Sequence, residues 1–167
     1  MVCGGALVRK ELNDVSYLES HPDIFQMFKD AWCYRYCQKL QGYHQGVVEA
    51  FSRIFNGAKV TIGPLEMQID EASVAEATEM PGQGERWFKT IVTKNIEFGS
   101  YLKPEFQSII WKRDVPTSHL ENKWQDLLKA IQVYITCEGR YDRVMLYHFK
   151  LMNNFTERNP LDLPHYL

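Results

Sequence analysis

The sequence predicts a mainly α fold, in which a single-domain helical bundle carries a small antiparallel β-hairpin at about residues 58–70. Two observations predict it. Apolar residues recur at three- and four-residue steps along several stretches, which is the spacing of amphipathic helices. Apolar and polar residues alternate on both sides of Gly63-Pro64, which is typical of a hairpin. A chain of 167 residues can bury a core without disulfides or metals, so one domain of five to seven helices is expected.

The domain is expected to span residues 21–167, after a weakly patterned and flexible lead-in over residues 1–20. His21-Pro22-Asp23 is a good helix start, and the apolar spacing that follows predicts one helix to about Gly42. A second helix begins after Gly46 and is closed by Asn56-Gly57. The apolar end at Leu167 indicates a docked tail or a natural chain that continues further.

The hairpin leads directly into a capped helix. Its apolar faces are expected to point inward, onto flanking helices, because a two-stranded ribbon is marginal alone. Asp70 is the predicted N-cap of a helix from Glu71 to about Met80, which Pro81 stops. The glycines of Gly82-Gln83-Gly84 are expected to serve a sharp turn, since the segment lacks the further residues of a phosphate-binding loop.

The second half of the chain is patterned less clearly. Short extended pieces are expected at residues 91–92 and 96–98, a turn or short helix at 103–106, and a buried apolar segment at 108–111. Ser118 is the expected N-cap of a long amphipathic helix to about Ile135. After a break at residues 137–139, a central helix is predicted from Arg140 or Tyr141 to about Thr156.

Composition narrows the function classes. The net charge is −2 and the pI is about 6.2, so bulk electrostatics do not favour nucleic acid or an anionic membrane. The N-terminus has no secretory signal pattern, and no apolar run reaches the ~18 residues that a transmembrane helix needs. A cytoplasmic or nuclear protein without membrane partner or cofactor is expected. Its four cysteines are then reduced thiols.

No catalytic or metal site is predicted. Cys33 and Cys37 share a helical face, but their spacing is not that of a zinc site, so core packing is the better interpretation. Cys137 and His148, with Glu138 to orient a base, could form a nucleophilic site of an enzyme of unknown class. No nucleophile motif supports that hypothesis, and burial of Cys137 is the simpler interpretation.

Charge is distributed unevenly along the chain. Residues 65–85 contain six acids and no Lys or Arg, whereas residues 86–113 contain six bases, two acids and several aromatic residues. Cations with interleaved aromatic rings are what single-stranded nucleic acid binding uses. The candidate residues for that alternative are Arg86, Trp87, Lys89, Lys94, Lys103, Lys112 and Arg113. The simpler interpretation is that the two segments neutralise each other and that the aromatic residues lie in the core.

Aromatic residues are abundant, with four Trp, nine Tyr and nine Phe. Since aromatic side chains are enriched at interface hot spots, a protein partner or self-association is expected.

Several motifs resemble a group of uncharacterised plant proteins labelled retrotransposon-like or putative plant transposon proteins. They are the series from Phe51 through Phe55-Asn56-Gly57, the hairpin end Ile69-Asp70-Glu71, residues 75–81 and 84–89, residues 136–143, Tyr147-His148-Phe149, and residues 161–167. The resemblance covers roughly residue 25 to the end. It implies a plant origin, descent from a mobile element and members that continue past this end point. It carries no activity onto particular residues.

The function expected from the sequence is therefore a non-enzymatic protein-interaction or self-assembly module derived from a plant mobile element. Nucleic acid binding through residues 86–113 is the alternative, and an enzyme around Cys137 and His148 is the third hypothesis.

Overall fold

The computed structural model describes residues 15–39, 45–80, 82–84, 98–109, 114–136 and 141–162. Its α-helices are α1 (Ser16–Glu19), α2 (Pro22–Asp30), α3 (Tyr34–Lys39), α4 (Gln45–Ile54), α5 (Glu71–Thr78), α6 (Asn122–Tyr134) and α7 (Leu146–Thr156). Its strands are β1 (Lys59–Ile62), β2 (Leu65–Gln68), β3 (Asp114–Pro116) and β4 (Arg143–Met145). The 3-10 turns are η3 (Phe98–Tyr101), η4 (Pro104–Phe106) and η5 (Thr117–His119). The fold is mainly α with small antiparallel hairpins, as predicted.

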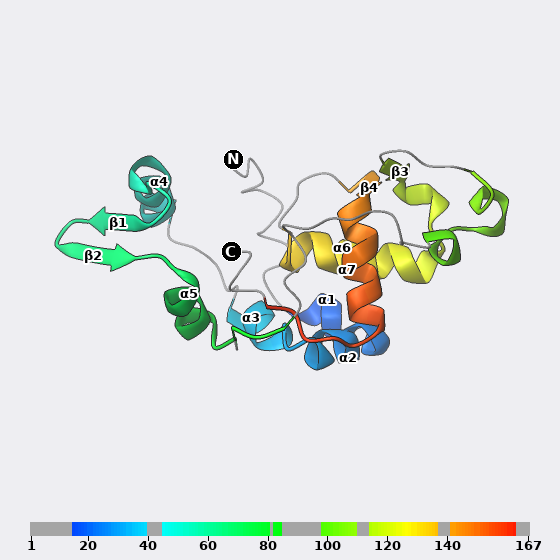
Figure 1. Ribbon diagram of the computed structural model, residues 1–167, viewed down its shortest axis with the longest axis horizontal. Helices are drawn as coiled ribbons and strands as arrows, with labels where there is room; N and C mark the ends of the chain where they lie inside the picture. The colour runs from blue at the N-terminus through cyan, green and yellow to red at the C-terminus, as the bar shows by residue number, and fades with distance from the viewer. Residues whose placement is uncertain are drawn as a thin grey trace.

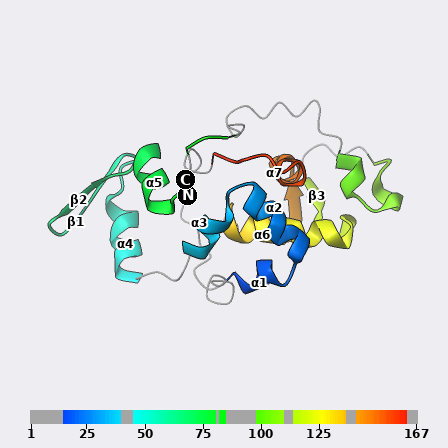
Figure 2. The ribbon, with the colours of Figure 1, turned by 90° about the horizontal axis from the view of Figure 1, so that it is seen from below.

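The molecule has two unequal parts (Figures 1 and 2). We call the part that holds α1, α2, α3, α6, α7, the β3–β4 pair and residues 98–109 the body, and the part formed by α4, β1, β2 and α5 the arm. In both views the arm projects from the body near α3. This separation was not predicted from the sequence.

The body holds the hydrophobic core. Helix α7 crosses α6, and α2 packs against both. At their meeting point Phe28 of α2 stacks on Phe155 of α7, with ring centroids 4.6 Å apart, and both rings are fully buried. Helix α6 forms because its apolar residues fall on one stripe, and it buries Leu127, Leu128 and Ile131 completely.

The strands β3 and β4 form a second antiparallel pair, with Val115 opposite Val144. Both valines are fully buried, so this pair closes the core above α6 and α7. The sequence-based prediction of a helix beginning at Arg140 or Tyr141 was therefore wrong for residues 143–145, which are extended, and α7 begins at Leu146. Val144 is β-branched and sits beside a buried partner, a setting that favours a strand over the first turn of a helix.

The single helix predicted from residue 22 to about Gly42 is divided into α2 and α3. Trp32 lies between them with a left-handed φ of 63°. In one continuous helix Ala31 and Cys33 would lie about 160° apart, on nearly opposite faces. Both are fully buried in the structure, because the break turns them toward the same core. Contacts from the segment after α7 fix the break, since Arg158 pairs with Asp30 and the Leu161 N–H donates to the Ala31 carbonyl.

Other boundaries also differ from expectation. Helix α6 begins at Asn122 after Glu121, so Ser118 is not its N-cap and lies instead in η5. Ser108 and Ile109 are exposed, not buried as predicted for that apolar segment. Helix α1 falls inside the expected flexible lead-in, and its Leu18 is fully buried in the core. The extended pieces predicted at residues 91–92 and 96–97 lie outside the described residues, and Phe98 begins η3.

Among the described residues, no helix combines the length and the apolar composition that a bilayer crossing demands.

Candidate interaction surface

Helix α4 carries an apolar stripe that the described part of the chain leaves largely uncovered. Val47, Val48, Phe51 and Ile54, with Phe55 just beyond the helix, recur at the spacing of one helical face. All except Phe51 are exposed, and Phe51 stacks on Phe55 with ring centroids 4.9 Å apart. No residue of α4 is buried. An amphipathic helix of this kind normally covers its apolar face against a partner element.

The β1–β2 hairpin presents a second apolar face on the arm. The register pairs Val60 with Met67 and Ile62 with Leu65, so these four side chains point to one side of the ribbon. Helix α4 packs against β1, and Val60 is buried. Leu65 is nevertheless 62% exposed and Met67 is 40% exposed. The expectation that the hairpin's apolar faces point inward is thus correct at Val60 and wrong at Leu65 and Met67.

Turn chemistry sets the geometry of the arm. The Asn56 side chain accepts hydrogen bonds from the N–H groups of Ala58 and Lys59 at 3.1 and 2.9 Å, and Gly57 takes a φ of 96°. Gly63 supplies the positive φ of 59° that the hairpin turn needs. Asp70 caps α5 as predicted, by accepting from the Ser73 N–H at 2.8 Å, and this bond lowers the pKa of the Asp70 carboxyl. The local features of the hairpin and the helix cap are therefore confirmed.

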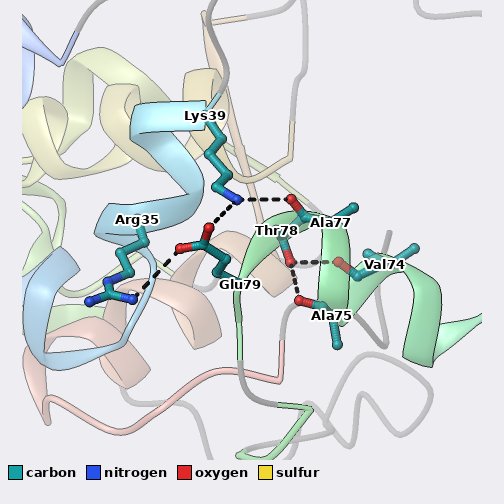
Figure 3. Close-up of polar contacts among 7 residues, drawn as sticks. All are labelled: Arg35, Lys39, Val74, Ala75, Ala77, Thr78 and Glu79. Carbon is teal, nitrogen blue, oxygen red and sulfur yellow. Dashed lines mark hydrogen bonds and ion pairs between the residues drawn. The ribbon is translucent and has the colours of Figure 1, made fainter.

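One carboxylate connects the arm to the body (Figure 3). Glu79 follows α5, and its carboxylate lies 2.7 Å from the Lys39 ammonium and 3.7 Å from the Arg35 guanidinium, both on α3. Lys39 also donates to the Ala77 carbonyl at 3.2 Å. The hydrogen bond and the charge of Lys39, followed by the charge of Arg35, lower the pKa of the Glu79 carboxyl. Next to it, Met80 is buried in the body core, so the arm is attached by an apolar anchor and an exposed ionic link.

Two acids of the acidic segment pair with cations that lie outside the basic segment. Glu66 forms an ion pair with Lys59 across the hairpin, and Glu79 pairs with Lys39 and Arg35. All three cations precede the acidic segment in the sequence. The predicted mutual neutralisation of the two segments is not seen for these acids.

Of the residues predicted to bind nucleic acid, Lys103 alone belongs to the described part of the chain. Its ammonium donates to the Ser118 carbonyl at 2.7 Å, and it follows η3 on the body. Arg86, Trp87, Lys89, Lys94, Lys112 and Arg113 lie outside the described residues. Within the described residues, Lys103 therefore connects the segment before η4 to η5, and the predicted set as a whole stays a prediction.

The candidate catalytic histidine is sealed in the body. His148 is fully buried in α7, and its Nδ1 accepts a hydrogen bond from the Met145 N–H at 3.0 Å. That bond occupies the nitrogen and fixes the start of α7. Cys137 and Glu138 lie outside the described residues.

The predicted core packing of the two cysteines on one helical face can be compared with their burial in the structure. Cys33 and Cys37 are both buried free thiols, as expected, and burial raises the pKa of the Cys33 thiol. Within the described ranges, no group of His, Cys, Asp and Glu side chains could hold a metal ion.

Gly84 was expected to serve a sharp turn, and its φ of 138° agrees with that role. A second requirement for glycine at this position comes from a close backbone contact. A Cβ at this position would lie 2.6 Å from the Pro160 carbonyl oxygen, so Gly84 permits two distant backbone segments to meet.

No protein-family model matches this chain, and no curated protein or solved structure matches it either. The candidate surface is accordingly defined by its own geometry. Sequence reasoning identified the apolar residues of α4 and the hairpin but not their exposure. The same alternation and helical spacing arise whether an apolar face is covered by the chain itself or left for another molecule.

Proposed function

We propose that this protein is a non-enzymatic protein-interaction module whose partner surface is the apolar face of the arm. One observation carries the proposal. Of the eight large apolar side chains that the described residues expose, six lie on the arm and two elsewhere. The six are Val47, Val48, Ile54, Phe55, Leu65 and Met67; the other two are Trp32 and Ile109. Clusters of exposed apolar side chains on soluble proteins mark interaction sites.

The hairpin adds a second property that suits a protein partner. Among the strands of the described residues, β1 and β2 pair only with each other, so each has one edge without a strand neighbour. An extended segment of another chain can add to such an edge through main-chain hydrogen bonds. Its side chains would then extend the apolar face that Leu65 and Met67 begin. Either a second copy of this chain or an unrelated protein could supply such an extended apolar segment.

The resemblance to plant retrotransposon-like proteins supports a setting for this module. We propose that it descends from a plant mobile element and acts in the cytoplasm or nucleus. Neither of the other hypotheses gains support from the described residues. For the enzyme hypothesis, His148 is fully buried in the core. For the nucleic acid hypothesis, the Lys103 ammonium donates a hydrogen bond to the Ser118 carbonyl.

The proposal is tested by changing one exposed apolar residue on each part. Leu65→Glu places a charge on the arm face, and Ile109→Glu is the matched control on the body, where the side chain is 43% exposed. Light scattering after size exclusion, over a range of concentrations, measures self-association. Quantitative pull-downs from plant extract, with the wild type and each of the two variants as bait, measure binding to other proteins.

The expected result is an oligomer or a captured protein that is retained by the wild type and Ile109→Glu and lost by Leu65→Glu. A monomer at every concentration, together with no captured protein that depends on Leu65, overturns the proposal. Equal loss with both variants also overturns it, because the surface would then not be specific to the arm. Circular dichroism confirms that each variant is folded.

A further inference from the structure

An open pocket of about 410 Å³ lies on the body at the turn between α2 and α3. It is lined by Lys29, Trp32, Tyr34, Arg35 and Glu79. This volume is within the range of pockets that hold small molecules. Its lining brings two aromatic rings together with two cations, and it lies apart from the apolar residues of the arm.

The backbone at Trp32 is in a conformation that disfavours a large side chain. Its φ is 63°, and the Cys33 N–H donates to the Phe28 carbonyl while the Trp32 N–H donates to the Lys29 carbonyl. These bonds define a helix end whose left-handed residue is usually glycine. Trp32 is 44% exposed, so part of its surface is open to a ligand. Strained residues of this kind cluster at ligand sites, where the surrounding structure maintains them.

The same geometry recurs at a second residue of the pocket. Glu79 has a φ of 56°, and the bonds from Met80 to Ala75 and from Glu79 to Glu76 reproduce the helix end seen at Trp32. Two helices thus end at the pocket with a functional side chain in the position that glycine would occupy at lower cost. Both residues line the pocket that lies between these helix ends.

The charges around the pocket favour an anion. The Lys29 ammonium lies 4.1 Å from the centre of the Phe25 ring and 5.6 Å from that of Tyr34. Arg35 has a side chain that is 73% exposed and a loose 3.7 Å contact with Glu79. Lys39, which is closer to Glu79 at 2.7 Å, offsets the charge of that carboxylate. Nearby, Asp30 pairs with Arg158, and Glu19 accepts a hydrogen bond from the Tyr34 hydroxyl.

We propose that this pocket binds a planar aromatic ring that bears an anionic group, the ring against Trp32 and the anion between Lys29 and Arg35. A mononucleotide and an aryl carboxylate both present this chemistry. Stacking on an aromatic face tolerates many ring systems, whereas the cations distinguish a charged ligand from its neutral analogue. Glu79 is placed to accept hydrogen bonds from amino or hydroxyl groups on the ring. The inference does not rest on the proposed role of the arm.

Calorimetric titration of the full chain at low salt tests the proposal. The probes are adenosine monophosphate and 2-naphthoate, with adenosine, 2-naphthol and inorganic phosphate as their partial analogues. We expect at least one of the two complete ligands to bind about tenfold more tightly than its own partial analogues. Binding of the nucleotide without 2-naphthoate assigns the site to nucleotides, and binding of both assigns it to aryl anions in general. No binding of either at millimolar concentration overturns the proposal.

Variants then locate the site. Trp32→Gly removes the ring and relaxes the strained backbone, so it is expected to fold normally and to lose binding by about tenfold or more. Arg35→Gln keeps the ring and should abolish the preference for the charged ligand. Arg53→Gln removes an exposed cation on α4 and should leave binding unchanged. Binding that survives Trp32→Gly, or that falls equally with Arg53→Gln, overturns the proposal.

Discussion

The body and the arm are built from helices of similar amphipathic pattern, yet the body buries its apolar side chains and the arm leaves most of its own exposed. Helices α2, α6 and α7 of the body place Phe28, Ile131 and Phe155 in one core, where each is fully buried. Helix α4 of the arm has an apolar stripe just as regular and buries none of it. Val60, the buried residue of the hairpin, does not belong to the body core. An amphipathic pattern therefore defines a face that can be covered, and the tertiary arrangement decides what covers it.

This difference predicts that stability is concentrated in the body. Burial of apolar side chains is the main favourable term in folding, so the core of the body should set the unfolding free energy of the chain. The arm has few buried contacts and an exposed ionic attachment, which are features of segments that open locally. Three changes separate the two parts, in order of decreasing effect.

The largest effect is expected from a cavity in the core of the body. Phe155→Ala removes a ring that is fully buried and stacked on Phe28, and we expect it to lower the unfolding free energy by about 3–5 kcal/mol. The matched truncation on the arm is Leu65→Ala, which should change the unfolding free energy by no more than about 0.5 kcal/mol. Urea unfolding followed by circular dichroism measures both. Comparable losses for the two variants would show that the arm shares the core of the body.

An intermediate effect is expected where two backbone segments meet. Gly84→Ala places a Cβ 2.6 Å from the Pro160 carbonyl oxygen at a φ of 138°, so the backbone must shift, at a cost of about 2 kcal/mol or more. Gly57→Ala is the control on the arm, because Gly57 also has a positive φ, of 96°, but nothing lies within 4 Å of the added atom. Its cost should be limited to backbone strain, about 1–2 kcal/mol.

Thermal unfolding ranks the stabilities of the two glycine variants, and hydrogen exchange at the amides of residues 161 and 162 reports the local contact, because Pro160 has no amide hydrogen. Faster exchange there is expected for Gly84→Ala alone. An equal destabilisation by the two substitutions would show that the close approach to Pro160 contributes nothing beyond the dihedral angle.

The smallest effect is expected from the ionic link between the parts. Lys39 and Arg35 hold the pKa of the Glu79 carboxyl below its ordinary value, so the folded state binds this proton less readily than the unfolded state. The stabilisation is therefore complete above the ordinary glutamate pKa and is lost as the pH falls through the lowered value. The protection of the α5 amides, taken relative to their intrinsic exchange rates at each pH, should fall over that acidic range, while the protection of the α6 amides should not.

Glu79→Gln should remove this acidic step and weaken the salt dependence of exchange in α5, because the link is solvent-exposed and screened by ions. Glu49→Gln, at an exposed ion pair within α4, serves as the control for loss of a surface carboxylate. An acidic step in α5 that persists in Glu79→Gln would assign it to another group.

The elements governed by local chemistry were predicted well from the sequence. The hairpin follows from its alternation and from Gly63, the start of α5 from Asp70, and the end of α4 from Asn56-Gly57. Each depends on groups that lie within a few residues of one another. The end of α6 was also predicted closely, because its apolar stripe is long and uninterrupted.

The failures share a different cause. The break at Trp32 has neither glycine nor proline at the break itself, and it depends on Arg158 and Leu161 from the other end of the chain. Strand β4 depends on its pairing with β3, about thirty residues earlier. The pocket at Trp32 likewise requires Glu79 to approach α3 from the arm. Such long-range contacts leave no signal in local spacing or composition.

The sequence by itself determined a mainly α chain with a hairpin at residues 58–70, a capped helix after it, and buried cysteines at positions 33 and 37. These features follow from backbone preferences and apolar periodicity, which act over short distances. Only the tertiary structure decided that α4 and Leu65 remain uncovered, and that Trp32 stands beside Arg35 and Glu79. Exposure and proximity are properties of the assembled surface, because they depend on where every other segment lies.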